Sequence, residues 1–375
     1  MSWEKVRLGD VTDSCLGKML DQQKNKGDYH PYLANINVRW GSFDLENLPQ
    51  MRFEDDEQER YGLEYGDLII CEGGEPGRCA IWKNEIPNMK IQKALHRVRV
   101  HNCLDYRYLF YWFLWSGKRG ALEQYFTGAT IKHMPGQKLK SVIIDKPPIE
   151  TQHRIADVLS AYDDLIENNR KQIKLLEEAA QRLYKEWFVN LHFPGHEHTK
   201  IVDGVPEGWK KRLLGDIVEV KYGKDHKSIP DGLIPVYGSG GFMRKCSQVL
   251  YDGESVLIPR KGSLNNIIYV DEAFWTVDTM FYTKMKMPNI GVFLYFFVKL
   301  FDMYSMNIGA AVPSMTTNIL NALDIIVPSS NILEHFQSTT KMYFRKMELL
   351  QKQIETAMQA RDRLLPKLMT GEVEV

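Results

Sequence analysis

The feature that most constrains this chain is an internal repeat. Residues 3–11 (WEKVRLGDV) recur as residues 209–217 (WKKRLLGDI), at an offset of 206 residues. Farther along, residues 109–114 (LFYWFL) correspond to residues 293–298 (FLYFFV) at an offset of 184, and Pro147 corresponds to Pro328 at 181. A steadily falling offset indicates two copies of one domain, the second having lost about 25 residues from its loops. The repeat therefore predicts two domains of similar fold.

A helical segment follows each copy. Its apolar residues are spaced alternately four and three apart over four heptads, which is typical of a coiled-coil seam. The first seam contains Ile155, Leu159, Tyr162, Ile166, Ile173, Leu176 and Leu183, and the second contains Phe336, Tyr343, Met347, Leu350, Ile354 and Leu364. Polar Asn169, Thr340 and Arg361 interrupt these seams. We expect the two helices to pair with each other; the alternative is two separate helices, each packed on its own domain.

These patterns predict an α+β fold. We expect two similar mixed α/β domains, separated by two long helices that form an antiparallel coiled coil. We expect the first domain at residues 1–149 and its helix at 150–190, then a Gly- and Pro-rich linker at 191–208. The second domain is expected at 209–330 and its helix at 331–368, with a tail at 369–375. Two similar domains at the ends of a stiff pair of helices would read two sites a fixed distance apart.

Composition narrows the class of protein. Lys plus Arg total 48 and Asp plus Glu total 48, so a polyanion site must come from local clustering and not from net charge. The five cysteines include no CxxC pair, which favours reduced thiols in the cytoplasm. The apolar runs at 108–115 and 292–298 are far shorter than the ~20 residues that span a bilayer, and the N-terminus lacks the apolar stretch of a signal peptide. We therefore expect a cytoplasmic protein without a membrane partner.

Motifs for catalysis are missing from the sequence. No P-loop is present, and the glycine-rich segment 72–77 (EGGEPG) carries two acids that would repel a phosphate. The acidic run at 54–59 is best interpreted as a solvated loop, and His192, His196 and His198 lie in the linker with loose spacing. We predict no metal site and no catalytic site. One alternative is a stand-alone enzyme such as a nuclease, which these absences disfavour.

Basic residues cluster in loop-like stretches of both copies, interleaved with glycine and polar residues. Such loops offer cations for phosphates and polar groups for base edges. Lys18 and Lys224 stand at equivalent places, near the end of the first repeat block in each copy. The candidate DNA-binding residues are Lys18, Lys24, Lys26, Arg39, Gln92, Lys132, His133 and Lys138 in the first copy, and Lys221, Lys224, Lys227, Arg244, Lys245, Arg260, Lys261 and Asn265 in the second. Asp278 is a further candidate for reading a base edge.

The sequence resembles one known family over nearly its whole length. The matching stretches are 128–134 (GATIKHM), 143–152 (IIDKPPIETQ), 163–169 (DDLIENN), 183–189 (LYKEWFV), 206–217 (PEGWKKRLLGDI) and 258–263 (IPRKGS). Together they are similar to the DNA specificity (S) subunit of type I restriction-modification systems. Residues 329–334 (SSNILE) depart from the Pro-Pro and Glu-Gln stretch usual in that family.

The resemblance implies a non-catalytic subunit that recognises double-stranded DNA. Each recognition domain would read one half of a bipartite target, while the helices set the spacing and dock two methyltransferase (modification) subunits. Those partners would bind S-adenosylmethionine, whereas this chain binds no cofactor, and motor-nuclease (restriction) subunits would cleave unmodified DNA. The remaining alternative is a coiled-coil adaptor that joins proteins and binds no DNA.

Overall fold

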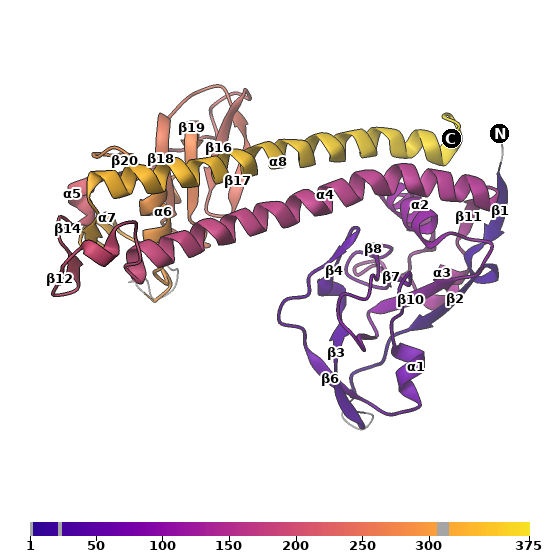
Figure 1. The fold of residues 1–375 in the computed structure, drawn as a ribbon. Coiled ribbons are helices and arrows are strands. Elements are labelled where there is room, and N and C mark those ends of the chain that lie inside the picture. Colours follow the sequence, from indigo (N-terminus) through magenta and orange to yellow (C-terminus); the bar gives the residue numbers. More distant parts are fainter. Residues whose placement is uncertain (1–2, 22–24, 306–314) are drawn as a thin grey trace. The chain divides into compact units, whose positions relative to one another are not determined.

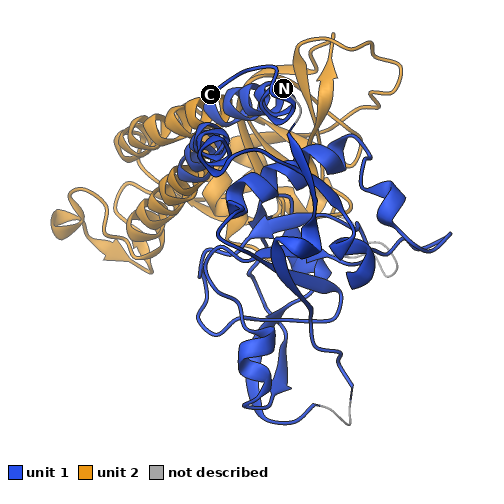
Figure 2. Cartoon of the chain, turned by 90° about the vertical axis from the view of Figure 1, so that its right-hand side faces the viewer, with its two compact units in different colours: residues 1–169, 353–375 blue, residues 170–352 orange. Residues whose placement is uncertain are grey.

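The chain folds into two compact units. The computed structural model describes residues 3–21, 25–305 and 315–375. Unit 1 comprises residues 1–169 and 353–375, and unit 2 comprises residues 170–352 (Figure 2). Two long helices, α4 (Ile149–Tyr184) and α8 (Ser330–Thr370), each contribute one half to each unit (Figure 1).

Unit 1 is built around a four-stranded antiparallel sheet with the order β2-β10-β7-β8. Its strands are β2 (Thr12–Leu16), β10 (Leu95–Val100), β7 (Leu68–Cys71) and β8 (Cys79–Ile81). A second group pairs β3 (Asp28–Leu33) parallel with β9 (Lys90–Ile91) and antiparallel with β6 (Gln50–Phe53). The small ladder β4 (Val38–Arg39) with β5 (Ser42–Phe43) and the helix α1 (Glu57–Tyr61) complete this part.

Unit 2 repeats this topology in one larger sheet. Its order is β15-β20-β18-β19-β16-β17, and the first four strands pair antiparallel in the same sequence as β2-β10-β7-β8. β16 runs parallel to the end of β19, as β3 does to β9, and β17 pairs antiparallel with β16. The strands are β15 (Val218–Tyr222), β16 (Ile234–Gly238), β17 (Gly241–Cys246), β18 (Tyr251–Pro259), β19 (Ile268–Thr276) and β20 (Met280–Met285).

An aromatic helix fills the core of each unit. In α2 (Tyr106–Lys118), all seven residues from Tyr108 to Leu114 are buried, and in α6 (Gly291–Lys299) all eight from Gly291 to Val298 are buried. Asp105 caps α2 by accepting hydrogen bonds from the N–H groups of Arg107 and Tyr108. Such apolar helices are stable because the sheet covers one side and the long helices cover the other.

Each unit closes with the same elements. A short helix, α3 (Gly136–Lys140) or α7 (Thr317–Asn321), precedes the last strand. That strand, β11 (Ile143–Lys146) or β21 (Asp324–Val327), pairs antiparallel with the first strand of its repeat, β1 (Glu4–Arg7) or β14 (Lys210–Leu213). α4 or α8 begins directly afterwards. In unit 2, α5 (Leu214–Ile217) follows β14, and a hairpin of β12 (Ile201–Val202) with β13 (Val205–Pro206) precedes it.

The halves of α4 and α8 pack side by side and antiparallel within each unit. In unit 1, Ile155 and Leu159 share a core with Leu365 and Leu368. In unit 2, the ring of Phe336 lies 6.1 Å from that of Tyr184 and 5.9 Å from that of Trp187. Every apolar residue predicted for the two seams is buried or half-buried. The mixed α+β fold with two long antiparallel helices is therefore confirmed.

Polar residues in the seams are paired within their own units. Arg361 of α8 forms an ion pair with Asp163 of α4, and Asn169 Nδ2 donates to Gln353 Oε1 at 3.1 Å. Thr340 donates to the carbonyl of Phe336, one turn back in its own helix. Since burying an unpaired polar group is costly, these partners let the seams tolerate polar residues. α4 ends in a π-helical turn, Lys185–Val189, after which the chain crosses to the β12–β13 hairpin.

Candidate nucleic-acid interface

The two units present loops on the same backbone framework, beginning where the first sheet strand ends. Gly17 N–H donates to the carbonyl of Leu95 at 2.9 Å, and Lys18 N–H donates to that of Ile91 at 3.0 Å. In unit 2, Gly223 donates to Met280 at 3.0 Å and Lys224 donates to Thr276 at 2.9 Å. The backbones of Lys18 and Lys224 thus occupy the same position, as the repeat predicts.

A second loop extends this equivalence. Glu72 N–H donates to the carbonyl of Ala94, and the Glu72 carbonyl accepts from the N–H of Met134, both at 2.8 Å. In unit 2, Arg260 donates to Thr279 at 2.8 Å and accepts from Met315 at 2.9 Å. Glu72 and Arg260 therefore stand at the same point of the framework with opposite charges. One step earlier in the adjoining turn, Lys93 corresponds to Asp278, which is a second exchange of charge.

Unit 2 carries accessible cations on these loops. Lys224, Lys227, Lys245 and Lys261 are exposed, and their ammonium groups form no ion pair with any residue the structure describes. Arg260 is half-buried, with its guanidinium carbon 5.3 Å from the ring centroid of Tyr222. The loop that follows packs on the β16–β17 turn, where Asn266 Nδ2 donates to the Ser239 carbonyl at 2.9 Å. This arrangement brings Lys224, Lys227, Lys261 and a stacked arginine onto loops, with Lys245 in β17.

Two predicted residues of unit 2, Arg244 and Asn265, have internal partners. Arg244 donates to the Asp231 carboxylate at 2.9 Å, to the carbonyl of Ile229 at 2.8 Å and to His226. Asn265 uses both ends of its amide, donating to Asp302 at 3.1 Å and accepting from Met303 N–H at 2.9 Å. Arg244 and Asn265 therefore hold loops in place in the structure, and their contact with DNA stays a prediction.

Lys221 is also engaged, although its side chain faces solvent. Its ammonium lies 2.7 Å from the Glu219 carboxylate. The hydrogen bond that Lys221 donates to Glu219 raises the pKa of Lys221 and lowers the pKa of Glu219. An exposed pair of this kind contributes little to stability and opens readily, so Lys221 remains a candidate phosphate ligand.

Lys18 is the clearest correction in unit 1. Predicted to bind DNA, it is 3% exposed, pairs with Glu57 and donates to the carbonyl of Arg52 at 2.9 Å. Its ammonium also lies 5.1 Å from the centre of the Phe53 ring. Because its charge is neutralised inside the unit, Lys18 supports the loop and presents no exposed ammonium to a phosphate.

Most other candidates in unit 1 are paired. Arg39 lies 3.7 Å from Asp44, Lys132 lies 3.6 Å from Glu123, and His133 Nδ1 lies 3.2 Å from Glu72 Oε2. Gln92 Oε1 accepts from Ala94 N–H at 3.1 Å and so stabilises the framework turn. Lys26 and Lys138 are exposed and unpaired among the described residues, whereas Lys24 lies outside them. Among the described candidates, unit 1 thus has two exposed and unpaired lysines, Lys26 and Lys138 of α3, against four in unit 2.

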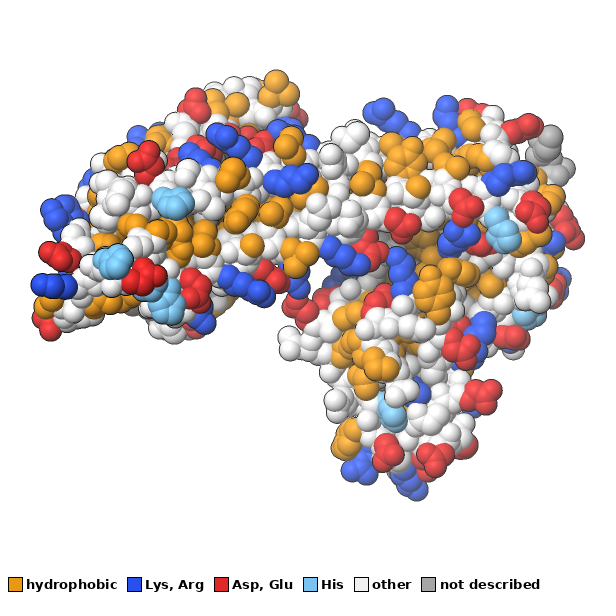
Figure 3. Space-filling model, in the orientation of Figure 1, with side chains coloured by type: hydrophobic (Ala, Val, Ile, Leu, Met, Phe, Trp, Pro, Cys, Tyr) orange, Lys and Arg blue, Asp and Glu red, His pale blue; other side chains and the backbone are white. Residues whose placement is uncertain are grey.

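The face drawn in Figure 3 shows no large patch of side chains of one charge. Lys and Arg side chains alternate there with Asp and Glu, as the balanced composition requires. On this face no broad field attracts a polyanion, so the candidates that matter most are the lysines that form no ion pair with a described residue. Among the described residues, no cluster of three or more His, Cys, Asp or Glu is arranged to hold a metal ion. No described helix combines the length and apolarity that crossing a membrane requires.

Two residues of this interface were missed by sequence reasoning. Tyr222 supports Arg260, and Glu72 occupies in unit 1 the position that Arg260 has in unit 2. A usable signal was present: aligning the buried strands 68–71 and 256–259 places Glu72 and Arg260 directly after them.

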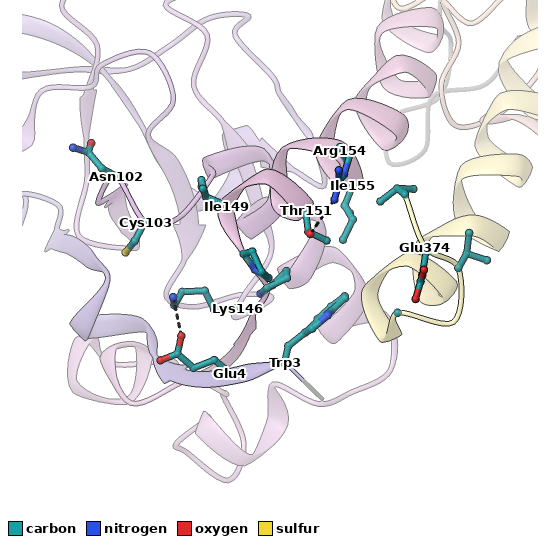
Figure 4. A pocket seen from close by; sticks show the side chains of 15 residues that line it. Trp3, Glu4, Asn102, Cys103, Lys146, Ile149, Thr151, Arg154, Ile155 and Glu374 are labelled. Atoms are coloured by element: carbon teal, nitrogen blue, oxygen red, sulfur yellow. Dashed lines mark hydrogen bonds and ion pairs between the residues drawn. The ribbon is translucent and has the colours of Figure 1, made fainter. Parts of the chain in front are cut away.

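A separate cavity of about 990 Å³ lies at the start of α4 in unit 1, away from these loops. Figure 4 shows Trp3, the Lys146–Glu4 ion pair, Arg154 and Glu374 around it. In unit 2 the matching tryptophan, Trp209, is covered by Phe193, with ring centroids 4.8 Å apart. Phe193, in the segment after α4, thus covers Trp209 in unit 2, whereas a cavity lies beside Trp3 in unit 1.

Comparisons with known proteins agree with this architecture. The family model described as "Type I restriction modification DNA specificity domain" matches residues 1–178 and 206–371, one match for each repeat. The MjaIX specificity subunit of a type I restriction enzyme from Methanocaldococcus jannaschii is 29% identical over 342 residues, covering 83% of this chain and 78% of the relative. The MjaVIII specificity subunit of the same organism is 24% identical, covering 100% of this chain and 93% of the relative.

A solved structure shares the fold. The crystal structure of a type I restriction-modification system S subunit from M. genitalium has a TM-score of 0.63 and 20% sequence identity, covering 98% of this chain and 96% of that one. The family match spans most of the chain, and both relatives are specificity subunits. The chain therefore belongs to the type I restriction modification DNA specificity domain family: it is the DNA specificity subunit of a type I restriction-modification system, and this family is non-catalytic.

Proposed function

We propose that unit 1 and unit 2 each read one half of a bipartite double-stranded DNA target. The observation that supports this most directly is the shared backbone framework, on which equivalent positions carry different side chains. A common framework gives both units the same way of approaching a groove. Different side chains on it make the two half-sites different in sequence.

The free lysines supply the phosphate contacts. In unit 2 these are Lys224, Lys227, Lys245 and Lys261, with Lys221 joining after its weak pair with Glu219 opens. In unit 1, Lys26 and Lys138 have the same role. Phosphate contacts set affinity and register without carrying sequence information, so base readout falls to other loop residues.

Two methyltransferase subunits and motor-nuclease subunits complete the proposed complex. α4 and α8 leave large apolar side chains exposed, with Leu175 at 63%, Met342 at 61% and Leu349 at 57%. Helix faces of this kind favour docking of protein partners, and the methyltransferases would sit there. S-adenosylmethionine and adenine methylation belong to those subunits, and cleavage belongs to the motor-nuclease subunits. We place the assembly in the cytoplasm, where it meets DNA.

The test is DNA binding by the chain assembled with its methyltransferase partner, measured at several salt concentrations. Neutralising two phosphate ligands reduces the slope of log K against log[salt] by about 2. We expect this for Lys224→Gln with Lys261→Gln. The matched control is Lys200→Gln with Lys210→Gln, two exposed lysines beside β12 and in β14, outside the recognition loops.

The outcome separates DNA recognition from the adaptor alternative. A sequence-preferring complex whose salt slope falls only in the Lys224 and Lys261 variant supports the proposal. An assembled complex that binds no DNA would support the adaptor alternative. DNA binding that does not depend on salt would contradict the proposed phosphate contacts.

A further inference from the structure

The charge exchange between Glu72 and Arg260 extends the proposed function, and rests on it. Both residues follow a buried strand, and both are fixed by two backbone hydrogen bonds of 2.8–2.9 Å to matching partners. Their side chains therefore leave the framework from the same point. A cation at one point and an anion at the other cannot both serve as phosphate ligands.

Arg260 is built as a rigid fork. Its guanidinium lies over Tyr222, which is 50% exposed and packs edge-on against the buried Phe281 with centroids 5.0 Å apart. One hydrogen bond, from Nη1 to the carbonyl of Asp278 at 3.3 Å, is the only one it forms with described residues. The remaining N–H groups have no partner among the described residues, so the proposal assigns them to a ligand. An arginine held by stacking loses little freedom on binding, which suits bidentate recognition.

Glu72 is built as a positioned acceptor. One carboxylate oxygen lies 3.2 Å from His133 Nδ1, and the other has no partner among the described residues. The His133 ring rests on Gly73, where an added Cβ would lie 3.0 Å from Nδ1. The Glu72 side chain is 20% exposed, so it is accessible but not loose.

We propose that Arg260 reads a guanine in the half-site of unit 2 and that Glu72 reads a cytosine in the half-site of unit 1. In the major groove, guanine presents O6 and N7, two acceptors that fit the arginine fork. Cytosine presents its N4 amino group, which a carboxylate accepts. Phosphates repel a carboxylate, so Glu72 has a favourable place on DNA only against such a base donor.

In this proposal, lysines near Arg260 bind phosphates while Arg260 reads the base. Lys261 is adjacent and exposed, and Lys224 lies on the neighbouring loop; neither has an ion pair among the described residues. They supply the phosphate attraction that positions the arginine. In unit 1, Lys93 is the equivalent of Asp278. Lys93 is exposed and its ammonium has no partner among the described residues, so it offers a cation close to the loop of Glu72.

The experiment uses the full complex with its methyltransferase partner. Methylated motifs are mapped in cells that express the wild type, Arg260→Gln or Glu72→Gln, and binding is measured with duplexes changed at one base pair. Wild type should prefer guanine by about 5- to 150-fold at one position of the half-site of unit 2, and Arg260→Gln should lose that preference. Glu72→Gln should lose a comparable preference for cytosine in the other half-site. The gap and the untouched half-site should not change.

Controls and a second variant make the result decisive. Arg212→Gln and Glu150→Gln remove like charges from exposed positions outside the loops and should leave the motif intact. Arg260→Lys keeps the charge but loses the fork: it should relax the motif if Arg260 reads a base, and preserve it if Arg260 holds a phosphate. This variant also carries the test if Arg260→Gln fails to assemble.

Two results would overturn the inference. One is a uniform loss of affinity with an unchanged motif in Arg260→Gln and Arg260→Lys. The other is the same uniform loss in Glu72→Gln, which would make Glu72 only an anchor for His133. Failure of the proposed function itself looks different, because the wild-type complex would then show no bipartite motif.

Discussion

Gly17 and Gly223 occupy the same position in the two units, each pressed against a backbone carbonyl. A Cβ on Gly17 would lie 2.4 Å from the carbonyl oxygen of Gln92, and one on Gly223 would lie 2.0 Å from that of Val277. Neither glycine has a positive φ, so close approach, and not backbone conformation, requires glycine here. The contact sets the path of the loop that carries Lys18 or Lys224.

Replacing either glycine by alanine should destabilise its own unit. Backbone cannot move aside as a flexible side chain would, so Gly17→Ala and Gly223→Ala should each cost about 1–3 kcal/mol of unfolding free energy. Urea unfolding of the full chain measures this. Gly240→Ala is the matched control, because nothing lies within 4 Å of its added Cβ. Equal stability of Gly223→Ala and Gly240→Ala would contradict the close approach.

A second prediction concerns the ion pair within the helix seam of unit 1. Asp163 of α4 pairs with Arg361 of α8, whose side chain is 14% exposed, and also accepts from the Tyr111 hydroxyl at 2.6 Å. Asp163→Ala leaves both groups short of a partner, although Arg361 keeps Asp362. We expect a loss of about 1–3 kcal/mol in unfolding free energy.

The neighbouring Asp164 provides the comparison. Its side chain is exposed and forms no ion pair with a described residue, so Asp164→Ala should change stability by less than about 0.5 kcal/mol. Chemical denaturation of both variants is sufficient. If Asp163→Ala and Asp164→Ala unfold at the same urea concentration, the Asp163–Arg361 ion pair does not stabilise the fold.

A third prediction is a pH dependence that arises in unit 1. His96 is 1% exposed, and its Nε2 lies 2.9 Å from the carbonyl oxygen of Met134, so the neutral ring donates there. Burial lowers the pKa of His96, since the charged form would lose its hydration. Below about pH 6.5, the ordinary pKa of histidine, the unfolded state therefore binds a proton more readily than the folded state does. The stability contributed by His96 is complete above about pH 6.5 and declines as the pH falls below it.

The other unit suggests the variant for this test. Phe281 of β20 is the equivalent of His96 of β10. His96 pairs with Leu16 at the end of β2, and Phe281 pairs with Tyr222 at the end of β15. His96→Phe should remove the part of the decline between about pH 6.5 and pH 5 that comes from this ring. It should also cost about 1 kcal/mol at neutral pH, since the Met134 carbonyl loses a donor. Unfolding curves at several pH values decide the matter, and parallel declines in wild type and variant would exclude His96 as the source.

The architecture was predictable from the sequence because its signals are local and repeated. Residues 3–11 and 209–217 begin matching strands, and the 3.5-residue period marks two helices that each hide one stripe. The repeat also placed Lys18 and Lys224 at equivalent backbone positions, where the hydrogen bonds now put them.

Side-chain roles were less accessible, because they depend on partners distant in sequence. Lys18 is neutralised by Glu57, 39 residues away, and Asn265 is tied to Asp302, 37 residues away. Neither pairing leaves a local pattern. The exchange of Glu72 for Arg260 needed the strand register of both sheets, since the loops around it differ in length and composition.

The central claim is that each unit reads its own half of the target, and exchanging one unit's loops tests it most directly. Residues 218–323 of this chain would be replaced by the matching segment of the MjaIX specificity subunit, and the methylated motif of the resulting complex would be mapped. The account predicts a new sequence in one half-site, with the other half-site and the gap retained. A motif in which both halves change, or one without two separated halves, would contradict it.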